Sequence, residues 1–99
     1  MTDMTENRKQ VSGKYLEYKG KPLVREGNTI CYGDMSDPCV LVLEIMSYAK
    51  DGDQLPDKVF IQVLEPKTNK IVRQGQKNSL YEAFSTGLIW LDLANRPAE

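Results

Sequence analysis

Two carboxylates in one short loop have the residue types and spacing to do acid and base chemistry. Asp34 and Asp37 lie three positions apart, and a carboxylate pair can act as acid and base when burial separates the two pKa values. No second reactive group lies near them in the sequence. Asp37 also precedes Pro38, a pair that is typical of a turn. The sequence therefore favours turn formation over catalysis in this loop.

A second acidic loop begins Asp51-Gly52-Asp53 and resembles the start of a calcium-binding loop. Counted from Asp51, however, Pro56 stands where that loop needs glycine, and Gln62 stands where it needs a bidentate glutamate. We therefore expect a solvated hairpin loop without a metal ion. The chain contains no histidine, which excludes imidazole ligands and Ser-His or Cys-His catalytic pairs within it. No cofactor and no catalytic residue are predicted, and we expect a protein that is not an enzyme.

The two cysteines, Cys31 and Cys39, flank the Asp34 loop. If that turn is centred near Met35, the thiols face each other across two strands, and a reversible disulfide becomes geometrically conceivable. The favoured alternative is that each cysteine is a small buried hydrophobic residue. Two cysteines without zinc-site spacing indicate reduced thiols and a cytoplasmic protein.

The clearest basic segment carries Lys67, Lys70, Arg73 and Lys77. Such a segment could hold the phosphates of a nucleic acid, with an affinity that falls as salt rises. Lys70 and Arg73 have opposite strand parity, so they share a face only where a β-bulge intervenes. The competing interpretation is an edge strand that its cations protect from aggregation. The net charge of −1 gives no overall attraction to DNA or to an anionic membrane, and no apolar run approaches a membrane span.

Short runs of β-branched and aromatic residues, separated by turn signals, predict the strands of an antiparallel meander. The strand candidates are residues 15–18, 23–26, 29–32, 39–48, 59–64 and 70–74. The fourth is apolar on both faces, as in a central strand. After Gly75 the period becomes helical, and the capping box from Ser79 to Glu82 predicts a helix over residues 80–94.

The predicted helix carries an apolar stripe, which we expect to cover one face of the sheet. Its members are Leu80, Tyr81, Ala83, Phe84, Gly87, Leu88, Trp90 and Leu91. The fold class is therefore α+β, an antiparallel β-meander of five or six strands with one C-terminal α-helix packed on a sheet face. A chain of 99 residues fits one such domain, expected over residues 14–96. We expect a disordered N-terminal tail at 1–13 and a C-terminal tail at 97–99.

The sheet face opposite the predicted helix is also apolar, which indicates a surface that needs a partner. Residues with the strand parity of that face are Val42, Met46, Tyr48, Phe60 and Leu64. Trp90 is a core residue if it lies within the helix stripe, and an interface anchor if it lies outside it. We expect a small non-enzymatic interaction or regulatory module that binds protein, including a second copy of itself as a homodimer. The alternative is a nucleic-acid-binding accessory protein that uses the Lys67 to Lys77 hairpin.

Three runs in the first half of the chain carry a resemblance to a known group: Tyr15-Leu16-Glu17-Tyr18-Lys19-Gly20-Lys21-Pro22-Leu23-Val24-Arg25, Gly27-Asn28-Thr29-Ile30 and Tyr32-Gly33-Asp34-Met35-Ser36-Asp37. Across most of residues 14–94 the sequence resembles a group of short, uncharacterised bacterial proteins. The resemblance implies a bacterial, cytosolic, free-standing small domain. It implies no activity, no cofactor and no functional residue.

Overall fold

The computed structural model of the chain describes residues 14–50 and 55–96. Six strands precede one helix, namely β1 (Lys14–Tyr18), β2 (Lys21–Glu26), β3 (Thr29–Tyr32), β4 (Val40–Tyr48), β5 (Pro56–Leu64), β6 (Ile71–Lys77) and α2 (Leu80–Asn95). The tails expected at residues 1–13 and 97–99, and the start of the acidic loop at residues 51–53, lie outside the described residues. Among those described, no helix has the length and apolar character needed to span a membrane.

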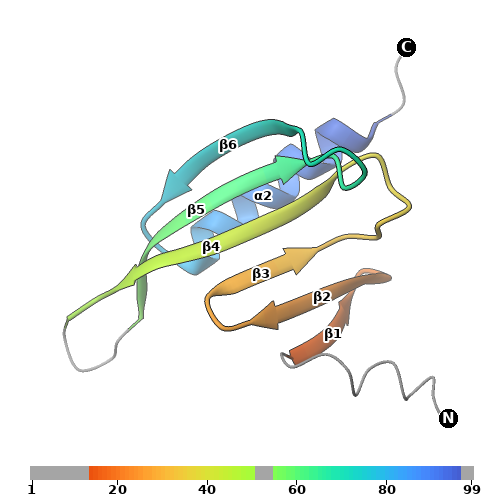
Figure 1. The fold of residues 1–99 in the computed structure, drawn as a ribbon. Helices are drawn as coiled ribbons and strands as arrows, with labels where there is room; N and C mark the ends of the chain where they lie inside the picture. Colours follow the sequence, from red (N-terminus) through yellow and green to blue (C-terminus); the bar gives the residue numbers. More distant parts are fainter. Residues whose placement is uncertain (1–13, 51–54, 97–99) are drawn as a thin grey trace, which may run out of the picture.

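The strands form one antiparallel sheet in which neighbours in sequence are neighbours in space, in the order β1-β2-β3-β4-β5-β6 (Figure 1). The predicted α+β meander with a C-terminal helix on one sheet face is confirmed.

The turn between β1 and β2 consists of Lys19 and Gly20, whose φ angles are 52° and 81°. Two successive residues with positive φ are what a two-residue type I′ hairpin requires.

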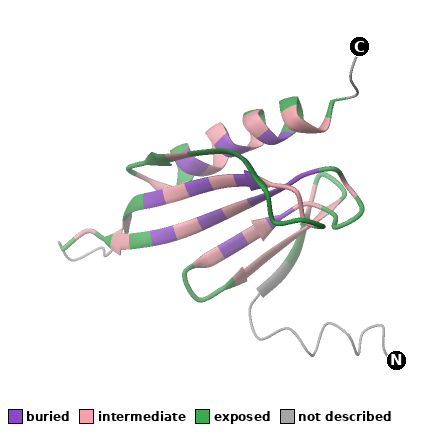
Figure 2. Cartoon of the chain, turned by 45° about the horizontal axis from the view of Figure 1, so that its top comes forward, coloured by how far each residue is buried: buried purple, intermediate pink, exposed green. Residues whose placement is uncertain are grey.

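Helix α2 begins at the predicted cap, where the Ser79 side chain accepts a hydrogen bond of 3.1 Å from the Glu82 amide. The helix crosses β4, β5 and β6 on one face of the sheet (Figure 1). Figure 2 shows buried and half-buried residues alternating along β4 and β5, as expected for a sheet with only one covered face. The buried core lies between that face and α2, and consists of Ile30, Tyr32, Cys39, Leu41, Leu43, Ile45, Val59, Ile61, Val63, Ala83 and Leu91.

Three aromatic rings attach the first strands to the helix. Tyr18, Tyr32 and Phe84 form a mutual cluster with ring centroids 5.6 to 5.9 Å apart, mostly edge to face. The Tyr32 hydroxyl donates a 2.7 Å hydrogen bond to the Tyr18 carbonyl. The β1–β2 hairpin is therefore held to α2 by side chains, although α2 covers only the later strands.

Two glycines set how closely α2 approaches the sheet. A Cβ atom on Gly87 would lie 2.6 Å from Leu41 Cδ1, and one on Gly75 would lie 2.7 Å from Trp90 Cη2. The predicted end of the last strand near Gly75 is wrong. The strand continues to Lys77, because Gly75 and Lys77 still pair with Ile61 and Val59 of β5, and the Trp90 ring fills the space beside Gly75.

The predicted helix stripe is correct apart from Tyr81, whose side chain is 81% exposed. Steps of four residues along α2 place Tyr81 in line with Ser85, Ile89 and Leu93, outside the buried row of α2, although Tyr81 also lines a cavity with Leu23 and Leu43. Leu80, the neighbouring residue, packs against the core instead.

Candidate interaction surfaces

The sheet face opposite α2 has no described element over it, and it carries a contiguous group of apolar side chains (Figure 1). Val24, Cys31 and Val42 are successive cross-strand partners, so they share this face on β2, β3 and β4. On β5, Phe60 and Leu64 alternate with residues buried under α2 and therefore face the same way. We call these five half-buried residues the open-face patch.

Strand parity does not place Met46 and Tyr48 in the open-face patch. The β4–β5 register shifts between Ile45 and Ser47 and again between Ser47 and Tyr48, so the simple alternation ends at Ile45. Met46 is 58% exposed at the first irregularity. The Tyr48 hydroxyl donates to Asn28 Oδ1 at 2.8 Å and accepts from Arg25 Nη2 at 3.2 Å, which ties Tyr48 to the β2–β3 turn.

Trp90 lies against β6 on the α2 side of the sheet, away from the open-face patch. Its ring packs on Gly75, and the Arg73 guanidinium carbon stands 4.4 Å from the ring centroid. The residue is half-buried and adjoins the core. The sequence predicted Trp90 as either a core residue or an interface anchor. In the structure, Trp90 has the position of a packing residue.

The predicted basic segment forms one edge of the sheet. Arg73 and Lys77 are the cross-strand partners of Val63 and Val59, which are buried under α2, so both cations belong to the α2 side of β6. The register of β5 and β6 shifts between Val63 and Leu64, but Lys70 precedes β6, so strand parity does not place it on the face of Arg73. The remaining two cations, Lys67 and Lys70, are exposed in the turn before β6.

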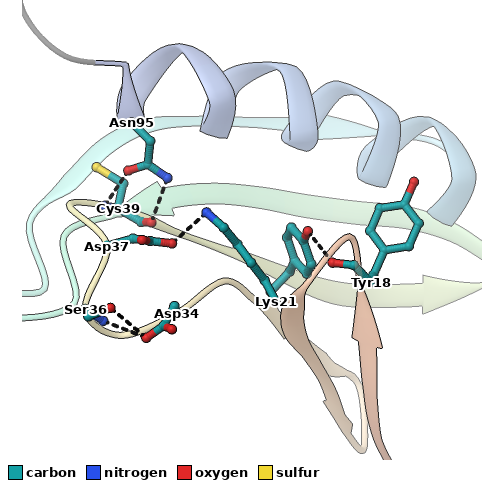
Figure 3. A network of polar contacts seen from close by, with 8 residues as sticks. Tyr18, Lys21, Asp34, Ser36, Asp37, Cys39 and Asn95 are labelled. Carbon is teal, nitrogen blue, oxygen red and sulfur yellow. Dashed lines mark hydrogen bonds and ion pairs between the residues drawn. The ribbon is translucent and has the colours of Figure 1, made fainter.

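The Asp34 loop contains turn and ion-pair contacts rather than a shared carboxylate site (Figure 3). Asp34 Oδ1 accepts hydrogen bonds of 2.9 Å from both the amide and the hydroxyl of Ser36, and these bonds lower the pKa of Asp34. Asp37 instead pairs with Lys21 Nζ at 2.7 Å. That hydrogen bond raises the pKa of Lys21. Each carboxylate thus has its own separate structural partner.

Asn95, which sequence reasoning missed, ties the end of α2 to the chain before β4 (Figure 3). Its side chain accepts from the Cys39 amide at 2.8 Å and donates to the Cys39 carbonyl at 3.3 Å. Both backbone groups of a buried residue are satisfied in this way. An asparagine at a helix end is the only sequence signal for this contact, and it does not specify the partner.

The alternative in which the two thiols face each other across two strands is not realised in the structure. Cys31 pairs with Val42 rather than with a residue next to Cys39, because the loop between β3 and β4 is not a tight turn. Cys31 therefore lies on the open face, whereas Cys39 belongs to the core, and both are free thiols. Burial raises the pKa of each thiol. On the open face, Cys31 lines a shallow cavity of 370 Å³ together with Val24, Glu26 and Thr29.

Within residues 14–50 and 55–96, no group of three or more histidine, cysteine or acidic residues could hold a metal ion. Comparisons of the sequence with protein-family models and with curated proteins, and of the structure with solved structures, found no match.

Proposed function

We propose that this chain is a small, non-enzymatic protein-interaction module of the bacterial cytosol that associates with itself through the open-face patch. The observation that supports the proposal is the continuity of the patch. Val24, Cys31 and Val42 form one row across three strands, and Phe60 and Leu64 flank the β5 partner of Val42. A contiguous apolar surface of this kind is typical of an interface. The two free thiols agree with a reducing compartment.

A second copy of the chain is a suitable occupant, because the open face carries charges of both signs beside the patch. Glu44 on β4 is opposite Phe60, and Lys58 lies two residues before Phe60 on the same side of β5. A two-fold contact can set Glu44 of one copy near Lys58 of the other. Two twisted sheets can pack face to face with their strands about 30° apart.

The outer side of α2 is the competing surface. Tyr81, Ile89 and Leu93 are more exposed there than the patch residues, at 81%, 61% and 49%. Charged side chains at Glu82 and Asp92 lie among them, so the apolar residues are interspersed rather than contiguous. Apolar residues scattered over a charged surface are common in proteins that do not associate. This side of α2 therefore supplies the control substitution.

Sedimentation equilibrium of three proteins tests the proposal. For the wild type we expect a concentration-dependent mass that approaches twice the 11.2 kDa of the chain and persists in about 0.5 M salt, because apolar contacts are not screened. Phe60→Lys should give a monomer, whereas Ile89→Lys, an equal change on α2, should still dimerise. Circular dichroism and thermal unfolding check that each variant folds. Loss of the dimer only in Ile89→Lys, or a monomeric wild type, would contradict the proposal.

A further inference from the structure

A second surface lies at the β6 edge of the sheet, away from the open-face patch. We propose that β6 binds an extended acidic peptide segment of a partner protein, which adds to the sheet as a further strand. This inference concerns a different surface and does not depend on self-association.

β6 lies at an edge of the sheet and can accept a further strand. Among the described residues, β6 is an outermost strand of the sheet and pairs with β5 alone. An outermost strand leaves every second residue with a backbone N–H and C=O directed away from the sheet. The strand is seven residues long, against five for β1 at the opposite edge, so it offers the longer template. Peptides that add to sheets bind through these backbone groups.

The β6 edge of the sheet is basic. From Pro66 to Tyr81 the sequence contains no acidic residue, and its cations are Lys67, Lys70, Arg73 and Lys77. All four are exposed. Arg73 is stacked on Trp90, yet its guanidinium keeps its charge and contributes to the local field. A strand with acidic side chains is therefore attracted to β6, and a basic one is repelled.

Exposed apolar side chains distinguish a binding edge from an edge that is only protected against aggregation. Lysine and arginine alone are sufficient to discourage aggregation. Here the strand also begins with Ile71 and Val72, which are 44% and 48% exposed beside the register shift. These aliphatic side chains give an added strand apolar contacts as well as charge. The segment that fits best alternates acidic and aliphatic residues.

Two other occupants fit this edge less well. Antiparallel pairing of β6 with β6 of a second copy would gather Lys70, Arg73 and Lys77 of both copies along one seam, where like charges repel. Single-stranded nucleic acid would need an open aromatic face for base stacking. Trp90, which adjoins β6, has its ring engaged by Gly75 and Arg73.

Amide hydrogen exchange and NMR titration test the proposal with a defined probe. The probe is a capped seven-residue peptide that alternates Glu and Val, added to the ¹⁵N-labelled full chain in low salt. We expect alternate β6 amides to become protected from exchange, and the affinity to fall with added salt. Lys70→Glu and Lys77→Glu should each weaken binding about tenfold or more, which is at least about 1.4 kcal/mol. Lys50→Glu, the same charge reversal outside this edge, should leave the affinity within about twofold.

Three outcomes would overturn the proposal. One is an unchanged affinity for a peptide that is N-methylated at alternate residues, which cannot pair as a strand on its methylated edge. Another is peptide binding that leaves the β6 amides unprotected. The third is tighter binding of an oligothymidylate of equal charge, which would assign this edge to nucleic acid. Repeating the titration with Phe60→Lys separates the result from self-association, because we expect this variant to bind the peptide like the wild type.

Discussion

Replacing Gly87 by alanine should destabilise the fold, although alanine is the better helix former. In an exposed helix interior the substitution stabilises by about 1 kcal/mol. Gly87, however, is buried in the middle of α2 and faces the sheet. The added Cβ would lie 2.6 Å and 2.9 Å from the two Cδ atoms of Leu41. The sign of the effect therefore depends on whether Leu41 can move.

The packing around Leu41 leaves little room for such a movement. Carbon atoms prefer a separation of about 3.5–4.0 Å, so Leu41 or the helix must retreat by about an ångström. Leu41 is fully buried and lies within the core beside Leu43 and Val63. Overpacking of this kind costs about 1–3 kcal/mol, and the short distances favour the upper half of that range. After the gain in helix propensity, we expect Gly87→Ala to lower the free energy of unfolding by about 1–2 kcal/mol.

Urea unfolding followed by circular dichroism measures this change, and Leu41→Ala supplies the test of its cause. Leu41→Ala alone should cost about 2–5 kcal/mol, because it leaves a cavity. In that background the Cβ at position 87 enters empty space, so Gly87→Ala should be neutral or stabilising. The coupling energy of the two substitutions should then lie within about 0.5–3 kcal/mol in the favourable direction. A stabilising Gly87→Ala in the wild-type background would refute the close approach of α2 to β4.

Three further substitutions probe the helix cap, the acidic loop and the open face. Ser79→Ala removes the acceptor for the Glu82 amide and should cost about 1 kcal/mol in urea unfolding. Asp34 has a pKa lowered by its hydrogen bonds from Ser36, so its contribution is present above its ordinary pKa and is lost as the pH falls. The stability difference between the wild type and Asp34→Ala should therefore shrink between about pH 5 and pH 2, and a constant difference would contradict this. Glu44→Gln should weaken self-association several-fold, because the contact with Lys58 of the other copy then loses its ion pair, and sedimentation equilibrium would show it. Tighter association of Glu44→Gln would contradict this contact.

The sheet and the helix could be predicted from the sequence because local signals agreed with the tertiary structure. Apolar residues alternate along β4 and β5, and the cap at Ser79 marks the start of α2. Both signals act over a few residues, so no knowledge of distant contacts is needed. The same alternation placed Val42, Phe60 and Leu64 on one face, as observed.

The predictions that the structure does not bear out depended on contacts between residues that are far apart in the sequence. The register shifts after Ile45 ended the alternation on which the assignment of Met46 and Tyr48 rested. The extent of β6 depends on its pairing with β5, where Gly75 and Lys77 are partners of Ile61 and Val59. The pairing of Cys31 with Val42 depends on the conformation of the loop between them. In each case the deciding partner lies across the sheet or on the helix.

An isotope-filtered NMR measurement on a mixture of ¹³C-labelled and unlabelled chains tests the proposed self-association most directly, because only contacts between copies give a signal. Self-association through the open-face patch predicts NOEs from the methyl groups of Val42 and Leu64 in one copy to open-face protons, such as the Phe60 ring, of the other. At a concentration where the mass is that of a dimer, intermolecular NOEs confined to Ile89 and Leu93 would contradict it. So would a protein that stays monomeric at about millimolar concentration, the weakest range in which specific association is measured.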